Sequence, residues 1–180
     1  MSTYSPHLLL PVSERDHTIG PASAPVTLLE YGDYECPYCR AAHVVVAEVR
    51  LRLMNRLRFA YRHFPLTNVH PHAQRAAEAA EAAGAQGRFW AMHDRLFEYQ
   101  DALEDDDLLV HAEAIGLDLP RFARELAARI HTARVREDFM SGVRSGVNGT
   151  PTFYLNDIRY DGGRDAVSLI EGIELALEVR

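Results

Sequence analysis

The sequence contains very little cysteine, with Cys36 and Cys39 as the only two in 180 residues. No second C-x-x-C motif is present to complete a four-cysteine zinc site, although nine histidines leave other ligand sets open. His63, His70 and His72 match no standard metal spacing. We therefore predict no metal site, and we expect these histidines to serve loop packing and capping.

Long apolar runs and a basic stripe are also missing. No apolar run approaches the ~20 residues that a membrane-spanning helix needs. The formal net charge is −7, and no cluster of basic residues is interleaved with aromatic ones, which argues against nucleic acid as a partner. The stretch Met1–Leu10 lacks the basic start and the ~7–15 apolar residues of a signal peptide. We therefore expect a cytoplasmic protein without membrane association, an expectation that a lost leader or a fused membrane domain would change.

The two cysteines lie where a predicted strand gives way to a predicted helix. The apolar run Val26–Tyr31 is typical of a buried strand, and a helical pattern extends from Pro37 to about Met54. The unpaired N–H groups and positive partial charge at a helix N-terminus stabilise a thiolate, which is the form that attacks disulfides. A structural disulfide would close too short a loop to constrain the unfolded chain much. We therefore predict that Cys36 and Cys39 cycle between dithiol and disulfide.

Glu30 is a candidate proton-transfer group beside the cysteines. Alternation along the strand places Val26, Leu28 and Glu30 on one face, so that the carboxyl group lies in apolar company. Burial there would raise its pKa and suit it to exchange a proton with the cysteines that follow. The alternative interpretation is a solvent-facing position at the strand end.

The remaining patterns predict a polar arm, a long helical region and a final hairpin with a helix. Residues Leu57–Arg62 alternate as a second strand would. The predicted division is an N-terminal arm at 1–24, a first domain from 25–66 and 146–180, and an all-helical insert at 67–145. Predicted helices in the insert are His72–Ala83, Arg88–Gln100, the residues after Asp105–Asp107, the residues after Pro120, and Ala133–Ser145. The hairpin is predicted at Thr152–Leu155 and Ile158–Tyr160, and the last helix at Asp165–Val179.

Apolar side chains at helical spacing supply the predicted core of these helices. On the helix after the cysteines they are Val44, Val45, Val46, Val49, Leu53 and Met54. In the insert they are Phe89, Trp90, Leu96, Phe97, Phe122, Leu126 and Ile130.

These motifs together resemble the thioredoxin superfamily. The resemblance rests on Cys36-Pro37-Tyr38-Cys39 after a strand and on Gly149–Phe153 before the hairpin. The 111 residues between Cys39 and Pro151, with their helical insert, are similar to the DsbA-like branch of bacterial thiol–disulfide oxidoreductases. The stretches Arg62–Leu66, His70–Ala73 and Phe89–His93 resemble that branch too. The implied fold is α/β, a thioredoxin fold with an inserted all-helical subdomain.

The resemblance also implies roles for individual residues. Cys36 matches the exposed nucleophile of this branch, and Cys39 the buried partner that resolves the mixed disulfide. Pro151 matches the cis-proline that faces the active site, and Thr150 precedes it; the backbone there pairs with the substrate chain as an added strand. Pro37 and Tyr38 between the cysteines would contact substrate. Glu30 falls where DsbA-like proteins keep a buried acid.

The dipeptide between the cysteines departs from the strongly oxidising DsbA proteins, which have Pro-His there. Tyr38 supplies no positive charge to lower the pKa of Cys36. Glu35 should oppose the thiolate through its like charge. We therefore expect a less acidic Cys36 and a less oxidising couple than in DsbA.

The predicted function is a protein disulfide oxidoreductase without a bound cofactor. Cys36 would form a mixed disulfide with protein or peptide substrates, and thioredoxin or glutathione would serve as reductant. Pro-Tyr also occurs in glutaredoxins, so a glutathione-linked reductase or transferase is an alternative. A redox-gated peptide-binding sensor or chaperone module is a second alternative.

Overall fold

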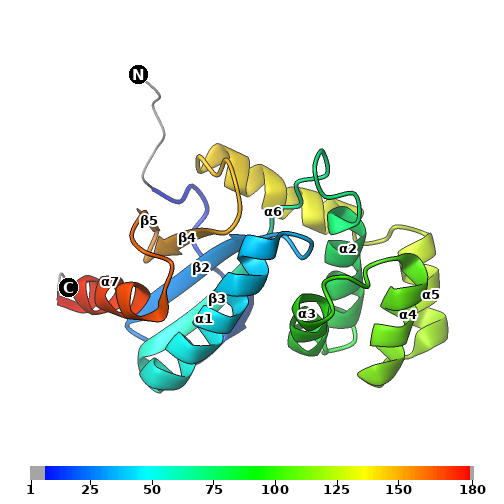
Figure 1. Ribbon diagram of the computed structural model, residues 1–180, viewed down its shortest axis with the longest axis horizontal. Coiled ribbons are helices and arrows are strands. Elements are labelled where there is room, and N and C mark those ends of the chain that lie inside the picture. The colour runs from blue at the N-terminus through cyan, green and yellow to red at the C-terminus, as the bar shows by residue number, and fades with distance from the viewer. Residues whose placement is uncertain (1–6, 179–180) are drawn as a thin grey trace. The chain divides into compact units, whose positions relative to one another are not determined.

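The chain, seen in a computed structural model that describes residues 7–178, forms two compact units (Figure 1). The sheet unit comprises Met1–Gly32, Ala41–Arg62 and Met140–Arg180, and the helical unit comprises Asp33–Arg40 and His63–Phe139. The cysteine segment thus groups with the helical unit and not with 25–66, because Asp33 and Gln100 tie it to that unit by hydrogen bonds. Residues 1–6 of the predicted arm, which include most of the stretch compared with a signal peptide, lie outside the described residues.

A five-stranded sheet forms the sheet unit, with the order β1-β3-β2-β4-β5. β4 is antiparallel to β2, and Glu30 of β2 lies opposite Phe153 of β4. Asn156 and Asp157 join β4 to β5 with φ angles of 45° and 71°, the left-handed conformation that two-residue hairpins favour. The predicted α/β fold is confirmed. The strands are β1 (His17–Ile19), β2 (Val26–Gly32), β3 (Leu57–His63), β4 (Thr152–Leu155) and β5 (Ile158–Tyr160).

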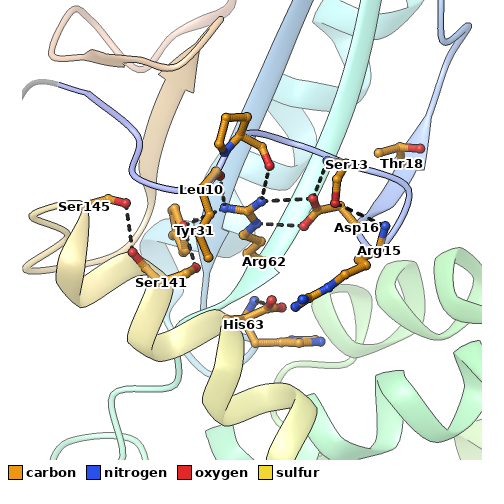
Figure 2. A network of polar contacts seen from close by, with 12 residues as sticks. Leu10, Ser13, Arg15, Asp16, Thr18, Tyr31, Arg62, His63, Ser141 and Ser145 are labelled. Atoms are coloured by element: carbon orange, nitrogen blue, oxygen red, sulfur yellow. Dashed lines mark hydrogen bonds and ion pairs between the residues drawn. The ribbon is translucent and has the colours of Figure 1, made fainter.

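The N-terminal segment is more ordered than the extended arm that the sequence predicted. Its β1 pairs antiparallel with β3, with Thr18 opposite Ala60. Arg62 of β3 also holds this segment, donating from Nε and Nη2 to Asp16 at 2.7 and 2.9 Å and from Nη1 to the Leu10 carbonyl at 2.8 Å (Figure 2). A three-residue strand of mixed polarity gives too short a pattern to be predicted from sequence.

Helix α1 (Pro37–Leu53) connects β2 to β3, and α7 (Ala166–Glu178) packs against β2. Val46, Val49 and Leu53 of α1 are buried as predicted. The prediction was wrong for Val44 and Met54, which are 65% and 69% exposed. Consecutive helical residues point about 100° apart, so adjacent valines cannot all face the core, and Met54 lies beyond the helix at a φ of 45°.

The helical unit is built around α2, an alanine-rich helix that packs against α3, α4 and α5. Its alanines are almost completely buried, and their small side chains let neighbouring helices approach closely. Trp90 is only partly buried, and Ile130 is 60% exposed because α5 has ended before it, so both depart from the predicted core. The helices are α2 (Ala73–Gly84), α3 (Phe89–Glu98), α4 (Asp105–Ala114), α5 (Leu119–Ala127) and α6 (Thr132–Arg144), whose last residues belong to the sheet unit.

The acidic run at the start of α4 caps that helix. Glu104 is the N-cap residue, and its side chain and that of Asp107 form a reciprocal capping box. Within residues 7–178, no helix is both long enough and apolar enough to cross a membrane.

Candidate active site

The dithiol lies at the N-terminus of α1, with Cys36 directly before the helix and Cys39 in its first turn, and both cysteines belong to the helical unit. The Cys36 N–H donates to the Asp33 carbonyl at 3.2 Å, which closes the turn that leads into the helix. The Cys36 carbonyl in turn accepts from the N–H groups of Cys39 and Arg40 at 3.1 and 3.2 Å. The two cysteines are not joined by a disulfide in this structure. Both thiols therefore lie at the positive end of the helix dipole, where a thiolate is stabilised.

Cys39 has a direct backbone donor. The Asp33 N–H points at the Cys39 Sγ at a distance of 3.4 Å. Cys39 is 0% exposed, so this hydrogen bond acts in a setting of low dielectric constant, where it counts for more than in water. A negative charge on the Cys39 sulfur is therefore favoured by a group that the loop itself supplies.

Cys36 is 3% exposed, whereas the resemblance implied an exposed nucleophile. The backbone of Cys36 is held on both sides, because its N–H donates to the Asp33 carbonyl and its carbonyl accepts from the Gln100 side-chain amide at 2.9 Å. The same amide donates to the Tyr34 carbonyl at 2.7 Å. The small cysteine side chain is consequently held close to the loop, while the neighbouring Tyr38 is 68% exposed.

Asp33 organises the loop that leads to the cysteines. Its side chain is 0% exposed and accepts three hydrogen bonds of 2.8 Å, from the N–H groups of Glu35 and Leu66 and from His70 Nδ1. An ionised carboxylate can accept all three hydrogen bonds because it has two oxygens, which act only as acceptors. The Asp33 side chain thus fixes the backbone whose N–H and carbonyl contact the two cysteines.

Glu35, directly before Cys36, pairs with His72. Its Oε1 lies 2.9 Å from His72 Nδ1, and its Oε2 accepts from the His72 N–H at 2.6 Å. The hydrogen bond to Glu35 raises the pKa of His72 above its usual value. The expected like charge beside Cys36 is therefore balanced whenever His72 is protonated.

An aromatic cluster packs against the loop that leads to the cysteines. Tyr34 is 1% exposed, and its hydroxyl lies 3.0 Å from His93 Nδ1. Its ring contacts those of His93 and Phe97 at centroid distances of 5.6 and 4.9 Å. Aromatic packing of this kind holds the segment in one conformation.

Glu30, Thr150 and Pro151 belong to the sheet unit. Glu30 is 2% exposed, so the solvent-facing alternative is excluded. The Thr150–Pro151 peptide bond is cis, and Pro151 is buried. The Thr152 hydroxyl donates to the Gly149 carbonyl at 2.8 Å, which closes the turn around that bond. The catalytic role of Glu30 and the substrate-binding roles of Thr150, Pro151, Pro37 and Tyr38 stay predictions.

The three histidines that the sequence brings close together do not converge. His70 contacts Asp33 and His72 contacts Glu35, while His63 Nε2 lies 2.8 Å from Glu81 Oε1. His63, Glu81 and Asp138 place potential ligand atoms within 4.8 Å of one another in the helical unit. Asp138 is itself paired with Arg134 and accepts from the His63 N–H at 3.1 Å, and burial raises its pKa. Hydrogen bonds and the Arg134–Asp138 pair join the members of this cluster, and the absence of a metal site stays a prediction.

Sequence reasoning missed Asp33, Gln100 and the two acid–histidine pairs. Asp33 and Glu35 are two residues apart, and so are His70 and His72. This matched spacing is the one signal that could have paired them. Gln100 carries no such signal, because it follows α3 at a distance of 64 residues from Cys36.

Comparison with known proteins agrees with this geometry. The thioredoxin family profile matches residues 12–174. The structure resembles that of oxidised BdbD from Bacillus subtilis, with a TM-score of 0.86 and 23% identity, covering 97% of this chain and 99% of that one. It also resembles a thioredoxin-like oxidoreductase from Silicibacter pomeroyi, with a TM-score of 0.81 and 28% identity, covering 92% and 94% of the two chains.

The curated proteins that the chain resembles in sequence are much longer than this chain. The Na(+)/H(+) antiporter NhaA 1 of Salinispora arenicola is 49% identical over 170 residues, which are 94% of this chain and 26% of the antiporter. The chain therefore spans about a quarter of the length of the curated relatives it matches. Because the family profile matches most of its length, the chain belongs to the thioredoxin family, and its fold is that of the DsbA-like members.

Proposed function

We propose that this protein is a thiol–disulfide oxidoreductase that exchanges the Cys36–Cys39 dithiol with protein disulfides. The observation that carries the proposal is the placement of the two cysteines at the N-terminus of α1, Cys36 directly before it and Cys39 in its first turn, with the Asp33 N–H directed at the Cys39 Sγ. An inert pair would need no donor for a charged sulfur.

In the reducing direction, the Cys36 thiolate attacks one sulfur of the substrate disulfide. One substrate thiolate leaves, and the other sulfur stays bound to Cys36 as a mixed disulfide. Cys39 then loses its proton and attacks the Cys36 Sγ, which releases the second substrate thiolate. Two electrons pass to the substrate, which takes up two protons, and Cys36 and Cys39 become a disulfide. The hydrogen bond from Asp33 favours the second step, because it stabilises Cys39 as a thiolate.

The remaining roles are proposed for residues of the sheet unit and for Pro37 and Tyr38. Glu30, 2% exposed, would serve as a proton carrier during the exchange. The backbone at Thr150 and the cis Pro151 would pair with the substrate as an added strand, and Pro37 and Tyr38 would contact the substrate between the cysteines. Tyr38 is exposed and available for such a contact.

Turnover of insulin disulfides with a thiol reductant tests the activity. Wild-type protein should catalyse several cycles, whereas Cys36→Ser should be inactive. Full activity of Cys36→Ser would refute the assignment of the nucleophile. A single oxidation event without turnover would favour the redox-gated sensor, and activity with glutathione alone would favour the glutathione-linked alternative.

The direction of exchange follows from the reduction potential of the pair. A value near that of thioredoxin, about −270 mV, would indicate a reductase, and a value near that of DsbA, about −120 mV, a disulfide donor. With Tyr38 between the cysteines, we expect a value below that of DsbA. Cytoplasmic location stays a prediction that cell fractionation would test.

The antiporter relatives do not extend the proposal to ion transport. The match covers 26% of the Salinispora arenicola antiporter, so the activity of that whole protein is not carried over to this chain. We propose that the part shared with those proteins is a thiol–disulfide exchange domain.

A further inference from the structure

Two acid–histidine pairs flank the dithiol, and one of them is accessible to solvent. Asp33 contacts His70 and Glu35 contacts His72, each at 2.8–2.9 Å. The Asp33 side chain is 0% exposed, whereas the Glu35 and His72 side chains are 20% and 41% exposed. The Glu35–His72 pair can therefore exchange a proton with water without opening the fold.

Glu35 directly precedes Cys36 in the chain, so a charge on its carboxylate is near enough for its field to reach the nucleophilic sulfur. With His72 protonated, the pair carries no net charge. With His72 neutral, the Glu35 carboxylate leaves one negative charge beside Cys36. That charge disfavours the thiolate, because two like charges at short range repel.

We propose that His72 is a positioning residue that controls the reactivity of Cys36 through Glu35, so that protonation of His72 favours the Cys36 thiolate. The inference rests on the proposed function, for which it names the residue that makes the nucleophile respond to pH. The two contacts of Glu35 with His72, one to the ring and one to the backbone N–H, hold the carboxylate in place in both protonation states of the ring.

The acids that face His72 all favour its protonated form. The hydrogen bond with Glu35 has the largest effect on the pKa of His72, burial opposes it, and the charges of Glu104 and Asp107 at the start of α4 add smaller effects that raise this pKa. His72 therefore carries a proton over more of the neutral range than an ordinary histidine. By linkage, formation of the Cys36 thiolate must raise the pKa of His72 by as much as protonation of His72 lowers the pKa of Cys36.

The experiment measures the pH dependence of Cys36 alkylation by iodoacetamide, in a Cys39→Ala background so that one thiol reacts. His72→Gln removes the charge and keeps the backbone N–H contact with Glu35. We expect it to raise the pKa of Cys36 and slow alkylation at pH 7 about three- to tenfold. Glu35→Gln should lower that pKa and speed alkylation.

The decisive comparison is His72→Gln in the Glu35→Gln background. If His72 acts through Glu35, the substitution there should change the pKa of Cys36 little. An equal effect in both backgrounds, or none in either, overturns the proposal. His131→Gln is the matched control, because it breaks a similar 2.8 Å histidine–glutamate pair with Glu125 that is not adjacent to the cysteines in sequence.

Two further readouts keep the test independent of folding and of turnover. An NMR titration of His72 in the protein with both cysteines intact should show a pKa that falls in Glu35→Gln; an unchanged value overturns the proposal even if His72→Gln fails to fold. Alkylation needs no substrate, so a protein that shows the linkage but does not turn over insulin disulfides would refute the proposed function alone. A protein that turns over but lacks the linkage would refute this inference alone.

Discussion

Asp33→Asn tests whether the loop beside the cysteines depends on a buried carboxylate. The wild-type side chain is 0% exposed and accepts from two backbone N–H groups, those of Glu35 and Leu66, and from His70 Nδ1. An asparagine amide has one oxygen, so its NH₂ group must face at least one of these donors.

The cost follows from the two orientations of the amide. With the oxygen toward Leu66 and His70, the Glu35 N–H loses its acceptor. With the amide reversed, the Leu66 N–H loses its acceptor, while neutral His70 can accept from the NH₂ group in its other tautomer. One backbone N–H is left without a protein acceptor in each case, which costs about 1–3 kcal/mol when the group is buried. We predict that Asp33→Asn lowers the free energy of unfolding by that amount.

Urea denaturation followed by circular dichroism measures this change. Asp101→Asn, at an exposed position in the same unit, is the control and should change the free energy of unfolding by about 0.5 kcal/mol or less. The disturbed loop should also slow the attack of Cys39 on a mixed disulfide, because Asp33 supplies the N–H that contacts its sulfur. A free energy of unfolding for Asp33→Asn within about 0.5 kcal/mol of wild type would refute the reasoning.

Three other substitutions test single ion pairs and hydrogen bonds in the two units. Asp16→Asn leaves the Arg62 guanidinium, 5% exposed, without its ionic partner, and should lower the free energy of unfolding by about 3–5 kcal/mol in urea denaturation. Gln100→Ala removes two hydrogen bonds from the loop, and should accelerate iodoacetamide alkylation of Cys36 about tenfold through easier local opening. Burial acts to raise the pKa of Glu78, but hydrogen bonds from arginine, glutamine and threonine side chains lower it, so the protein should lose stability as pH falls below about 4.5. Glu78→Gln should flatten that part of the stability–pH curve, and an unchanged slope would contradict the assignment.

The fold could be predicted because its main elements have strong local patterns. The apolar run of β2 is buried on both faces, and the alanine-rich α2 has helical spacing throughout. The Asn156-Asp157 turn marks the hairpin directly. These signals depend on residues close together in the chain. They also placed both cysteines at the start of α1.

Features that depend on distant residues could not be predicted. β1 is short and exists because it pairs with β3, and the contact of Asp16 with Arg62 joins residues 46 positions apart. The Glu35–His72 pair joins residues 37 positions apart and balances the negative charge expected beside Cys36 when His72 is protonated. Propensity and alternation carry no information on such pairings.

The departures within helices have a different cause. Val44 and Ile130 are apolar residues that the helical pattern assigned to the core, but they are 65% and 60% exposed. Three consecutive valines point to different sides of a helix, so they cannot all be buried. Ile130 lies beyond the end of α5 at Ala127. Apolar character alone therefore does not fix which face of a helix is buried.

Trapping of a mixed disulfide tests the central claim most directly. Cys39→Ala should accumulate a covalent adduct when mixed with a disulfide peptide, and mass spectrometry after digestion should place the peptide on Cys36. Cys36→Ala under the same conditions should form no such adduct at a comparable rate. An adduct at Cys39 that forms as fast as the one at Cys36, or no adduct in either variant, would contradict the assignment of Cys36 as the attacking thiol.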